Sequence, residues 1–263
     1  MVTSQVLDIC PLVISAPFGN YVQPVGTTPT LGTFTALRRG GRKAAFGRAL
    51  LTVRYYRRLG AWVNKIGLRN PGIDSLTANP KRSAPLDQCL LSIHGFNGQE
   101  WNHLLNRVRE LKPLAVELNI SCPNVGELTW PPNLFADAIA TGVPVIVKVP
   151  PVRYEKMAQE AFAQGVRWFH ATNTLPVPRG GMSGAPLKPL ALGVVSWLRT
   201  EFGHEVRIVG GGGIRSAADV AEYAQAGANR FAIGTYLFTP KALANAAALV
   251  AEIQTAAAQL ATD

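Results

Sequence analysis

The sequence contains only three cysteines among its 263 residues, at Cys10, Cys89 and Cys122. Three scattered cysteines do not make a disulfide framework, and no CxxC or HExxH spacing predicts a metal site. The chain also lacks a basic start followed by a long apolar run, and no stretch approaches the length that crosses a bilayer. We therefore expect a cytoplasmic protein without a secretion signal, a membrane segment or a bound metal.

Linkers rich in Ser, Gly or Pro are absent too, and no shift in composition divides the chain. Hydrophobic residues make up 48% of the sequence and charged residues 16%, which is typical of a globular protein rather than a disordered one. The length suits one α/β barrel or two ordinary domains. Because no linker is found, we expect one domain over residues 1–263.

Acidic residues are few, since 16 Asp and Glu stand against 26 Lys and Arg and leave a net charge of +10. Much of the excess lies between Arg38 and Arg58, in LRRGGRKAAFGRALLTVRYYRRLG. Such a segment attracts phosphate, nucleic acid or an acidic partner. No nucleic-acid motif or interleaved aromatic pattern accompanies the charge, so we interpret it as a solvated basic face and do not expect nucleic-acid binding.

Short β-rich segments recur along the whole chain, and helical patterns such as NHLLNRVRELK and AADVAEYAQAGA separate several of them. The eight segments cover residues 12–15, 30–35, 90–93, 115–120, 143–149, 166–172, 206–210 and 229–235. Strands that alternate with helices predict a parallel sheet, either a closed barrel or a doubly wound open sheet. The count of eight and the absence of an early GxGxxG favour a (β/α)8 TIM barrel.

Polar residues follow several of these strands, at the edge where a barrel of this kind carries its chemistry. They are Asn119, Ser121, Cys122 and Asn124 after the fourth strand, Lys148 in the fifth, Asn173 and Thr174 after the sixth, Gly210 to Gly213 after the seventh, and Gly234 and Thr235 after the eighth. These residues are expected to meet at one mouth.

The glycine runs IVGGGGIRS and AIGTYLF follow the last two strands, where this fold commonly builds a phosphate site from backbone amides. Either run alone could be a tight loop that needs positive φ and binds nothing. The pair together favours phosphate, which a phosphorylated substrate or flavin mononucleotide would supply equally.

Lys148 lies in the middle of an apolar strand, where an inward ammonium must be paired or must face a ligand. A structural ion pair and an outward snorkelling side chain are the alternatives. Beside a flavin, a fixed cation would stabilise the negative charge of the reduced ring near N1 and O2.

Several motifs occur together: ELNISCPN, VIVKVPP, HATNT followed by GGMSGAPLKPLAL, and IVGGGGIRSAADVAEYAQAGANRFAIGTYLF, with VNKIGLRNPGI earlier. From about Pro11 to Phe238 the chain resembles the dihydroorotate dehydrogenase family, in its soluble class with a cysteine base. This resemblance implies FMN-dependent oxidation of dihydroorotate to orotate in de novo pyrimidine biosynthesis.

By the same resemblance, Cys122 is the base that removes the C5 proton while hydride passes from C6 to flavin N5. A free thiol has a pKa of about 8.5, so it accepts a proton once its site favours the thiolate. Lys148 is the second catalytic residue, on the N1 side of the flavin. The implied substrate-binding residues are Asn64, Gly67, Leu68, Asn119, Asn124, Asn173 and Thr174. The implied FMN-binding residues are Ala16, Gly19, Asn119, Lys148, Gly184, Gly211, Gly212, Gly213, Gly234 and Thr235.

The chain departs from the family pattern at TLGTFTALRRGGRK, where a lysine that contacts flavin and substrate is missing. Thr33 and Thr35 are similar to the serine class of the family instead. This departure motivates one alternative, a related FMN oxidoreductase that acts on another cyclic amide or an enone. A second alternative is a non-catalytic barrel that binds a partner through Arg38 to Arg58.

The electron acceptor is left open by the residues. Fumarate would serve a self-sufficient homodimer, whereas one soluble class uses NAD through a partner subunit with FAD and an iron–sulfur cluster. This chain has no cluster-binding cysteine set and no Rossmann fingerprint. We favour a partner-dependent or dye-coupled homodimer, with the basic segment as docking face.

Four histidines complete the candidates. His170 precedes the Asn173 loop and could approach a flavin, but a packed histidine bonded to backbone is the preferred interpretation. His94, His103 and His204 are expected on the surface or in loops.

Overall fold

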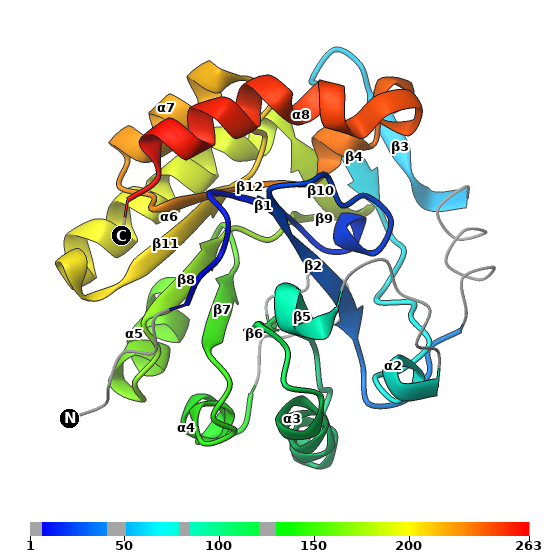
Figure 1. The fold of residues 1–263 in the computed structure, drawn as a ribbon, viewed down its shortest axis with the longest axis vertical. Helices are drawn as coiled ribbons and strands as arrows, with labels where there is room; N and C mark the ends of the chain where they lie inside the picture. The colour runs from blue at the N-terminus through cyan, green and yellow to red at the C-terminus, as the bar shows by residue number, and fades with distance from the viewer. Residues whose placement is uncertain (1–6, 41–50, 79–84, 121–129, 263) are drawn as a thin grey trace.

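Eight strands close into a barrel, drawn in the middle of Figure 1. They are β1 (Leu12–Ile14), β2 (Thr27–Phe34), β5 (Leu90–Ile93), β6 (Ala115–Leu118), β7 (Val145–Val149), β8 (Trp168–Ala171), β11 (Arg207–Gly211) and β12 (Arg230–Ile233). The computed structural model describes residues 7–40, 51–78, 85–120 and 130–262. The strand order is β1-β12-β11-β8-β7-β6-β5-β2, and every neighbouring pair is parallel. The predicted (β/α)8 barrel is confirmed.

Helices cover the outside of this barrel (Figure 1). They are α3 (Gly98–Leu111), α4 (Leu134–Ile139), α5 (Glu155–Ala163), α6 (Lys188–Phe202), α7 (Ala217–Gln225) and α8 (Pro240–Leu260), with α2 (Ser75–Ala78) as a single turn. Two of them begin with an N-cap hydrogen bond: the Asn97 side chain accepts from the Glu100 amide in α3, and the Ser216 side chain accepts from the Asp219 amide in α7. Within the described ranges, no helix is long and apolar enough to span a membrane.

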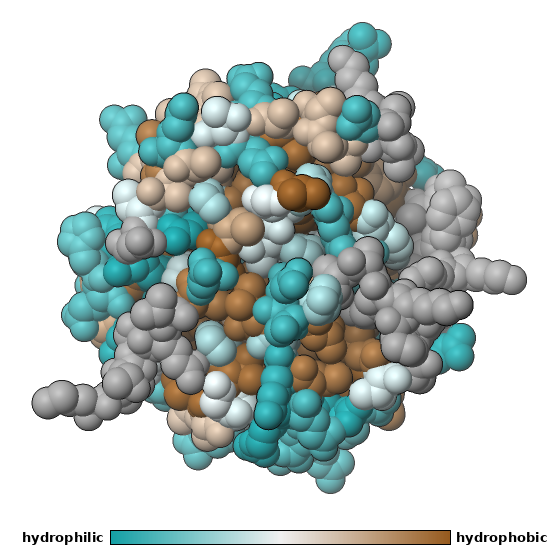
Figure 2. Space-filling view, viewed as in Figure 1, coloured by the Kyte–Doolittle hydropathy of each residue, from teal (hydrophilic) through white to brown (hydrophobic). Residues whose placement is uncertain are grey.

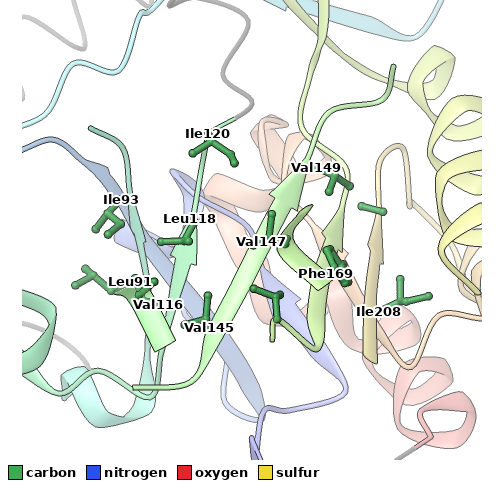
Figure 3. Packing of buried hydrophobic residues seen from close by; sticks show 14 of the residues in the cluster. Leu91, Ile93, Val116, Leu118, Ile120, Val145, Val147, Val149, Phe169 and Ile208 are labelled. Carbon is green, nitrogen blue, oxygen red and sulfur yellow. The ribbon is translucent and has the colours of Figure 1, made fainter. Parts of the chain in front are cut away.

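Apolar side chains cover both faces of the strands, as a barrel enclosed by helices requires. Figure 3 shows the outward set, in which Val116 and Leu118 of β6 stand beside Val145 and Val147 of β7. The inward set fills the barrel and consists of Leu7, Ile9, Val13, Leu90, Ala115, Ile146, Val209 and Ala232. On the face drawn in Figure 2, apolar residues gather in the middle and polar ones lie mostly around the rim.

A polar layer follows the inward apolar one. Side chains two positions apart in a strand share a face, so Ser92, Glu117 and Lys148 point inward like Leu90, Ala115 and Ile146 before them. His170 of β8 pairs with Lys148 of β7 in the ladder. The barrel interior therefore changes from apolar to charged toward the carboxyl ends of the strands.

A second sheet, which the sequence did not predict, joins two long connections. Its antiparallel strands are β3 (Arg54–Tyr56), β4 (Ala61–Asn64), β10 (Gly180–Gly184) and β9 (Leu175–Val177), in that order. The first two follow β2 and the last two follow β8, so both connections leave carboxyl ends of barrel strands. The sheet thereby lies on the same side of the barrel as the polar layer.

Candidate functional site

The polar layer is built around Glu117, whose side chain is completely buried. His170 Nδ1 donates to Glu117 Oε2 at 2.6 Å, and Lys148 Nζ lies 3.7 Å from Oε1. The three residues come from β6, β8 and β7, which are adjacent in the barrel. Lys148 is therefore an ammonium with a buried counter-charge, held among neighbouring strands.

Burial alone would raise the pKa of the Glu117 carboxyl, but the positive charge of Lys148 and the contacts with His170 and Ser92 oppose it. They hold the pKa of Glu117 at about 2, so the group is ionised at neutral pH. Burial also lowers the pKa of His170, and the Lys148 charge lowers it further. A neutral imidazole that donates from Nδ1 to an ionised carboxylate agrees with the lowered pKa of both groups.

A separate chain of hydrogen bonds runs from Ser92 of β5 to Asn173, which follows β8. Asn173 Nδ2 donates to Asn119 Oδ1 at 2.8 Å, and Asn119 Nδ2 donates to Thr33 Oγ1 at 2.8 Å. Thr33 Oγ1 lies 3.0 Å from Ser92 Oγ, and the Thr174 amide donates to Asn173 Oδ1. Three of the residues expected at the substrate, Asn119, Asn173 and Thr174, thus lie together.

Thr33 lies in the segment where the family resemblance expects a lysine, and its contacts in this chain are well defined. It is half-buried, and its hydroxyl contacts both Asn119 and Ser92. A neutral hydroxyl of this segment therefore lies beside Asn119.

Asn70, which the sequence reasoning did not single out, fastens the VNKIGL loop to the barrel. Its Oδ1 accepts from the amides of Thr35 and Gly72, and its Nδ2 donates to Thr35 Oγ1 and the Leu68 carbonyl. Leu68 is one of two expected substrate residues with positive φ there, Gly67 being the other. Asn64 lies in β4, where it pairs with Gly181 of β10, and among the described residues it makes no hydrogen bond with Asn119 or Asn173.

The expected phosphate glycines come together in two places. A Cβ on Gly184 would lie 2.4 Å from the Gly60 carbonyl oxygen, and one on Gly213 would lie 2.9 Å from that of Gly184. Both have positive φ, as does Gly212. Gly211 has ordinary φ but packs on the Ala232 carbonyl of β12. Close approach of the β4, β10 and β11 connections accounts for these glycines, and it keeps side chains out of that junction.

Gly234 and Thr235 lie beside the other expected flavin residues at the end of β1. A Cβ on Gly234 would meet Ser15 at 3.4 Å, next to Ala16, and Thr235 begins η5 (Thr235–Leu237). Gly19 is buried against the Thr30 backbone of β2, where a Cβ would lie only 2.4 Å from the carbonyl oxygen. Close packing against the β2 backbone therefore accounts for glycine at this position.

Two expected residues, Cys122 and Asn124, lie outside the described residues. The structure describes the four histidines. His94 lies in the loop after β5, within the expected surface or loop positions, but it is buried there and donates from Nδ1 to the Asn119 carbonyl at 2.7 Å. His170 is packed as expected, but its partner is the Glu117 carboxylate rather than backbone. In the described part of the chain, no group of three or more His, Cys, Asp or Glu side chains could hold a metal ion.

Residues 31–254 match the family model described as dihydroorotate dehydrogenase. The chain belongs to the dihydroorotate dehydrogenase family. The catalytic subunit of dihydroorotate dehydrogenase B (NAD(+)) from Thermoplasma volcanium is 30% identical over 200 residues, 67% of this chain and 66% of that protein. Dihydroorotate dehydrogenase A (fumarate) from Limosilactobacillus reuteri is 30% identical over 208 residues, 67% of each protein. The chain thus spans about two thirds of the length of these curated relatives.

Solved structures agree with the barrel. The crystal structure of DHODH from Eimeria tenella in complex with ferulenol matches with a TM-score of 0.68 at 18% identity, over 87% of this chain and 76% of that one. At this identity the likeness bears on the fold alone.

Glu117 is the main residue of this dihydroorotate dehydrogenase family member that the sequence reasoning missed. The signal was present, because Glu117 interrupts the apolar run AVELNI just as Lys148 interrupts VIVKV. Two opposite charges on the inner faces of adjacent strands predict an ion pair once the strand register is known.

Proposed function

We propose that this chain is an FMN-dependent dihydroorotate dehydrogenase that oxidises dihydroorotate to orotate in de novo pyrimidine biosynthesis. The observation that carries the proposal is the joined pair Asn119 and Asn173 beside the buried Lys148 ammonium, in a chain that belongs to this family. Dihydroorotate is a flat ring of amide groups with a carboxylate, and side-chain amides read such a ring through donors and acceptors in fixed directions.

The residues at this mouth fit a flavin mononucleotide. Lys148 provides a positive charge with only 7% of its side chain exposed, and Gly184 and Gly213 add no side chain of their own where the β4, β10 and β11 connections meet. When bound, the flavin would supply the acceptor for the hydride that leaves the substrate. Lys148, Asn119, Ala16 and Gly19 would lie along its ring. Gly184, Gly211, Gly212, Gly213, Gly234 and Thr235 would hold the ribityl chain and the phosphate.

The roles of the side chains follow from their chemistry. Cys122 would remove the proton from C5 of dihydroorotate, which requires the thiolate form. Asn119 and Asn173 would bind the ring edges together with Thr174, Asn124, Asn64, Gly67 and Leu68. Lys148 would keep its positive charge in place, because Glu117 compensates it inside the barrel.

An absorption spectrum of the purified protein tests cofactor and substrate in one experiment. We expect a yellow protein whose flavin band bleaches anaerobically when dihydroorotate is added. A yellow protein that does not bleach would contradict dihydroorotate as the substrate but would support FMN as the cofactor. A colourless protein that FMN cannot reconstitute would contradict both assignments.

Two variants test the base. At neutral pH, Cys122→Ala and Cys122→Ser should retain the yellow colour but reduce their flavin with dihydroorotate far more slowly than the wild type. Equal rates of flavin reduction in the wild type and Cys122→Ala would show that another group removes the C5 proton.

For the electron acceptor, we propose a homodimer that passes electrons to a partner subunit carrying FAD and an iron–sulfur cluster. One relative is named as a catalytic subunit of the NAD(+) type, and another as the fumarate type. Arg54, Arg57 and Arg58 are exposed and positively charged, as a docking face for an acidic partner requires. Replacing Arg57 and Arg58 with glutamate should weaken partner binding, and unchanged affinity would refute this docking face. Analytical sedimentation of the purified chain measures its mass in solution and so tests whether it is a dimer.

A second candidate, oxidation or reduction of another cyclic amide or an enone, is favoured by Thr33. Thr33 lies in the segment that lacks the lysine expected to contact flavin and substrate, and its neutral hydroxyl contacts Asn119. Turnover of uncharged cyclic amides or enones, with none of dihydroorotate, would select this candidate.

A further inference from the structure

The pairing of β5 with β6 ends with a side chain in the place of a backbone amide. In a parallel ladder, a residue donates to one carbonyl of the neighbouring strand and accepts from the amide two positions further along it. The Asn119 amide donates to the Ile93 carbonyl at 3.0 Å, so the Asn119 carbonyl would next accept from the Gly95 amide. His94 Nδ1 donates to that carbonyl instead, at 2.7 Å. The imidazole therefore continues the ladder by one bond beyond the end of β5.

The loop after β5 turns away from the ladder because it packs on α3. A Cβ on Gly95 would lie 2.8 Å from the ring of Trp101, which is buried near the start of that helix. Glu100 fastens the loop twice: its amide donates to Asn97 Oδ1 at 2.9 Å, and its carboxylate accepts from the Phe96 amide at 3.1 Å. The histidine at the start of this loop is therefore carried by a segment that is fixed to the helix.

The His94 ring is enclosed, and its proton has a defined place. Only 5% of the residue is exposed, and its ring lies edge-to-face against Phe96 and Trp101, with centroids 4.7 and 6.0 Å away. Its backbone amide donates to the Phe34 carbonyl of β2. Burial lowers the pKa of His94, so at neutral pH the imidazole is uncharged and has one N–H. Because a carbonyl only accepts, that proton lies on Nδ1, toward Asn119.

The residue held by this bond is one of the expected substrate residues. The Asn119 backbone is fixed on its amide side by Ile93 and on its carbonyl side by His94, so the Cα between them cannot turn. We propose that His94 is a positioning residue that fixes the Asn119 backbone and thereby aims the Asn119 side-chain amide at the substrate. This inference deepens the proposed function and rests on it. Without the imidazole, the peptide after Asn119 would be held from the β5 side by its amide bond alone.

Two substitutions separate the donor of His94 from the volume of its ring. His94→Leu keeps an apolar side chain of similar bulk without a donor. His94→Asn is smaller, but its amide nitrogen is separated from Cα by as many bonds as Nδ1 is. Phe96→Leu is the control for packing, because it removes the edge-to-face contact and leaves the donor, and Phe96 is 39% exposed. The probe is orotate, titrated into each flavin-loaded protein and followed by the shift of the flavin absorption band.

We expect His94→Leu to raise the orotate Kd by between about threefold and tenfold, because the energy of one hydrogen bond limits the effect. His94→Asn should restore binding to within about twofold of the wild type, and Phe96→Leu should bind equally well. An unchanged Kd in His94→Leu would overturn the proposal. An equal loss in Phe96→Leu would overturn it in favour of general packing. A loss of about tenfold in His94→Asn would do the same, whether or not His94→Leu folds.

Amide hydrogen exchange gives a readout that needs neither flavin nor orotate. The Asn119 amide, followed by NMR in the apo proteins, should exchange faster in His94→Leu than in the wild type, because local opening of the ladder end becomes easier. In His94→Asn it should exchange at the wild-type rate. Unchanged exchange in His94→Leu would overturn the positioning role. A wild type that binds no orotate, in a series that shows these exchange rates, would contradict the proposed substrate alone and support His94 as the residue that holds Asn119.

Discussion

His170 Nδ1 and Glu117 Oε2 meet 2.6 Å apart inside the barrel, and both side chains are buried. The carboxylate cannot release its charge to water, so its stability depends on the imidazole, the Ser92 hydroxyl and the Lys148 ammonium around it. Ser92 also contacts Thr33, whose hydroxyl accepts from Asn119 of the candidate substrate site. Changes to this cluster should therefore affect folding, pH dependence and ligand binding together.

Acid should remove the stabilisation that Glu117 provides. Its pKa falls from 4.5 to about 2 in the folded protein, so the contribution is complete above about pH 4.5 and is lost as the pH falls toward 2. The difference corresponds to roughly 3 kcal/mol of unfolding free energy. Urea titrations of wild type and Glu117→Gln at several pH values measure it. Their difference should shrink as the pH falls through this window, and a constant difference would mean that Glu117 is not ionised.

His170 should add a second acid-sensitive range at higher pH. Its folded pKa is below the ordinary 6.5, mainly because of burial, so the unfolded chain takes up the proton first. Stability is complete above about pH 6.5 and falls as the pH decreases below it. His170→Asn keeps a donor for Glu117 but cannot titrate. Its unfolding free energy should depend less on pH between 6.5 and 5 than that of the wild type, and identical slopes would contradict the assignment.

Removal of the Lys148 charge should destabilise the fold through Glu117. Lys148→Met leaves a buried carboxylate with only neutral partners, and loss of one partner of a buried pair costs about 3 to 5 kcal/mol. The double variant Lys148→Met with Glu117→Gln removes both charges and should recover much of that loss. Chemical denaturation of the apo forms, analysed as a double-mutant cycle, measures the coupling. Additive effects would show that the two charges do not interact.

The barrel could be predicted from the sequence because each of its strands is buried on both faces and leaves a local apolar run. VIVKV and RIVGG carry that signal by themselves. The second sheet leaves no such apolar run in the sequence, because β3 and β9 are only three residues long. Its pairing is also distant, since Asn64 pairs with Gly181 more than a hundred positions away. Its pairing depends on where the barrel places the two connections.

The candidate site, too, could be predicted from the sequence only in part. Lys148 is visible in the sequence because a lone ammonium in an apolar strand demands a partner. The partner is not visible, because Glu117 meets Lys148 only through the register of three parallel strands. Thr33 and Ser92 are similar: hydroxyls are common in strands, and only the closed barrel brings these two to 3.0 Å.

Gly184 allows the most direct test of the glycine junction. Its φ is +97°, and a Cβ there would lie 2.4 Å from the Gly60 carbonyl oxygen, so the β4 and β10 connections would have to separate. Gly184→Ala should lower FMN affinity and destabilise the protein by more than about 1 kcal/mol, because strain in the positive-φ region adds to the clash. Calorimetric FMN titration and thermal unfolding measure the two effects.

Gly193 provides the matched control for Gly184, since it lies within α6 on an exposed position and a Cβ there meets no atom within 4 Å. Gly193→Ala should raise stability by roughly 0.5 to 1 kcal/mol, because alanine loses less conformational entropy in a helix than glycine does. FMN affinity should stay at the wild-type value. If both variants lowered FMN affinity equally, the effect would come from general loosening of the barrel. If only Gly184→Ala did, close approach of backbone at this junction would be what shapes the flavin site.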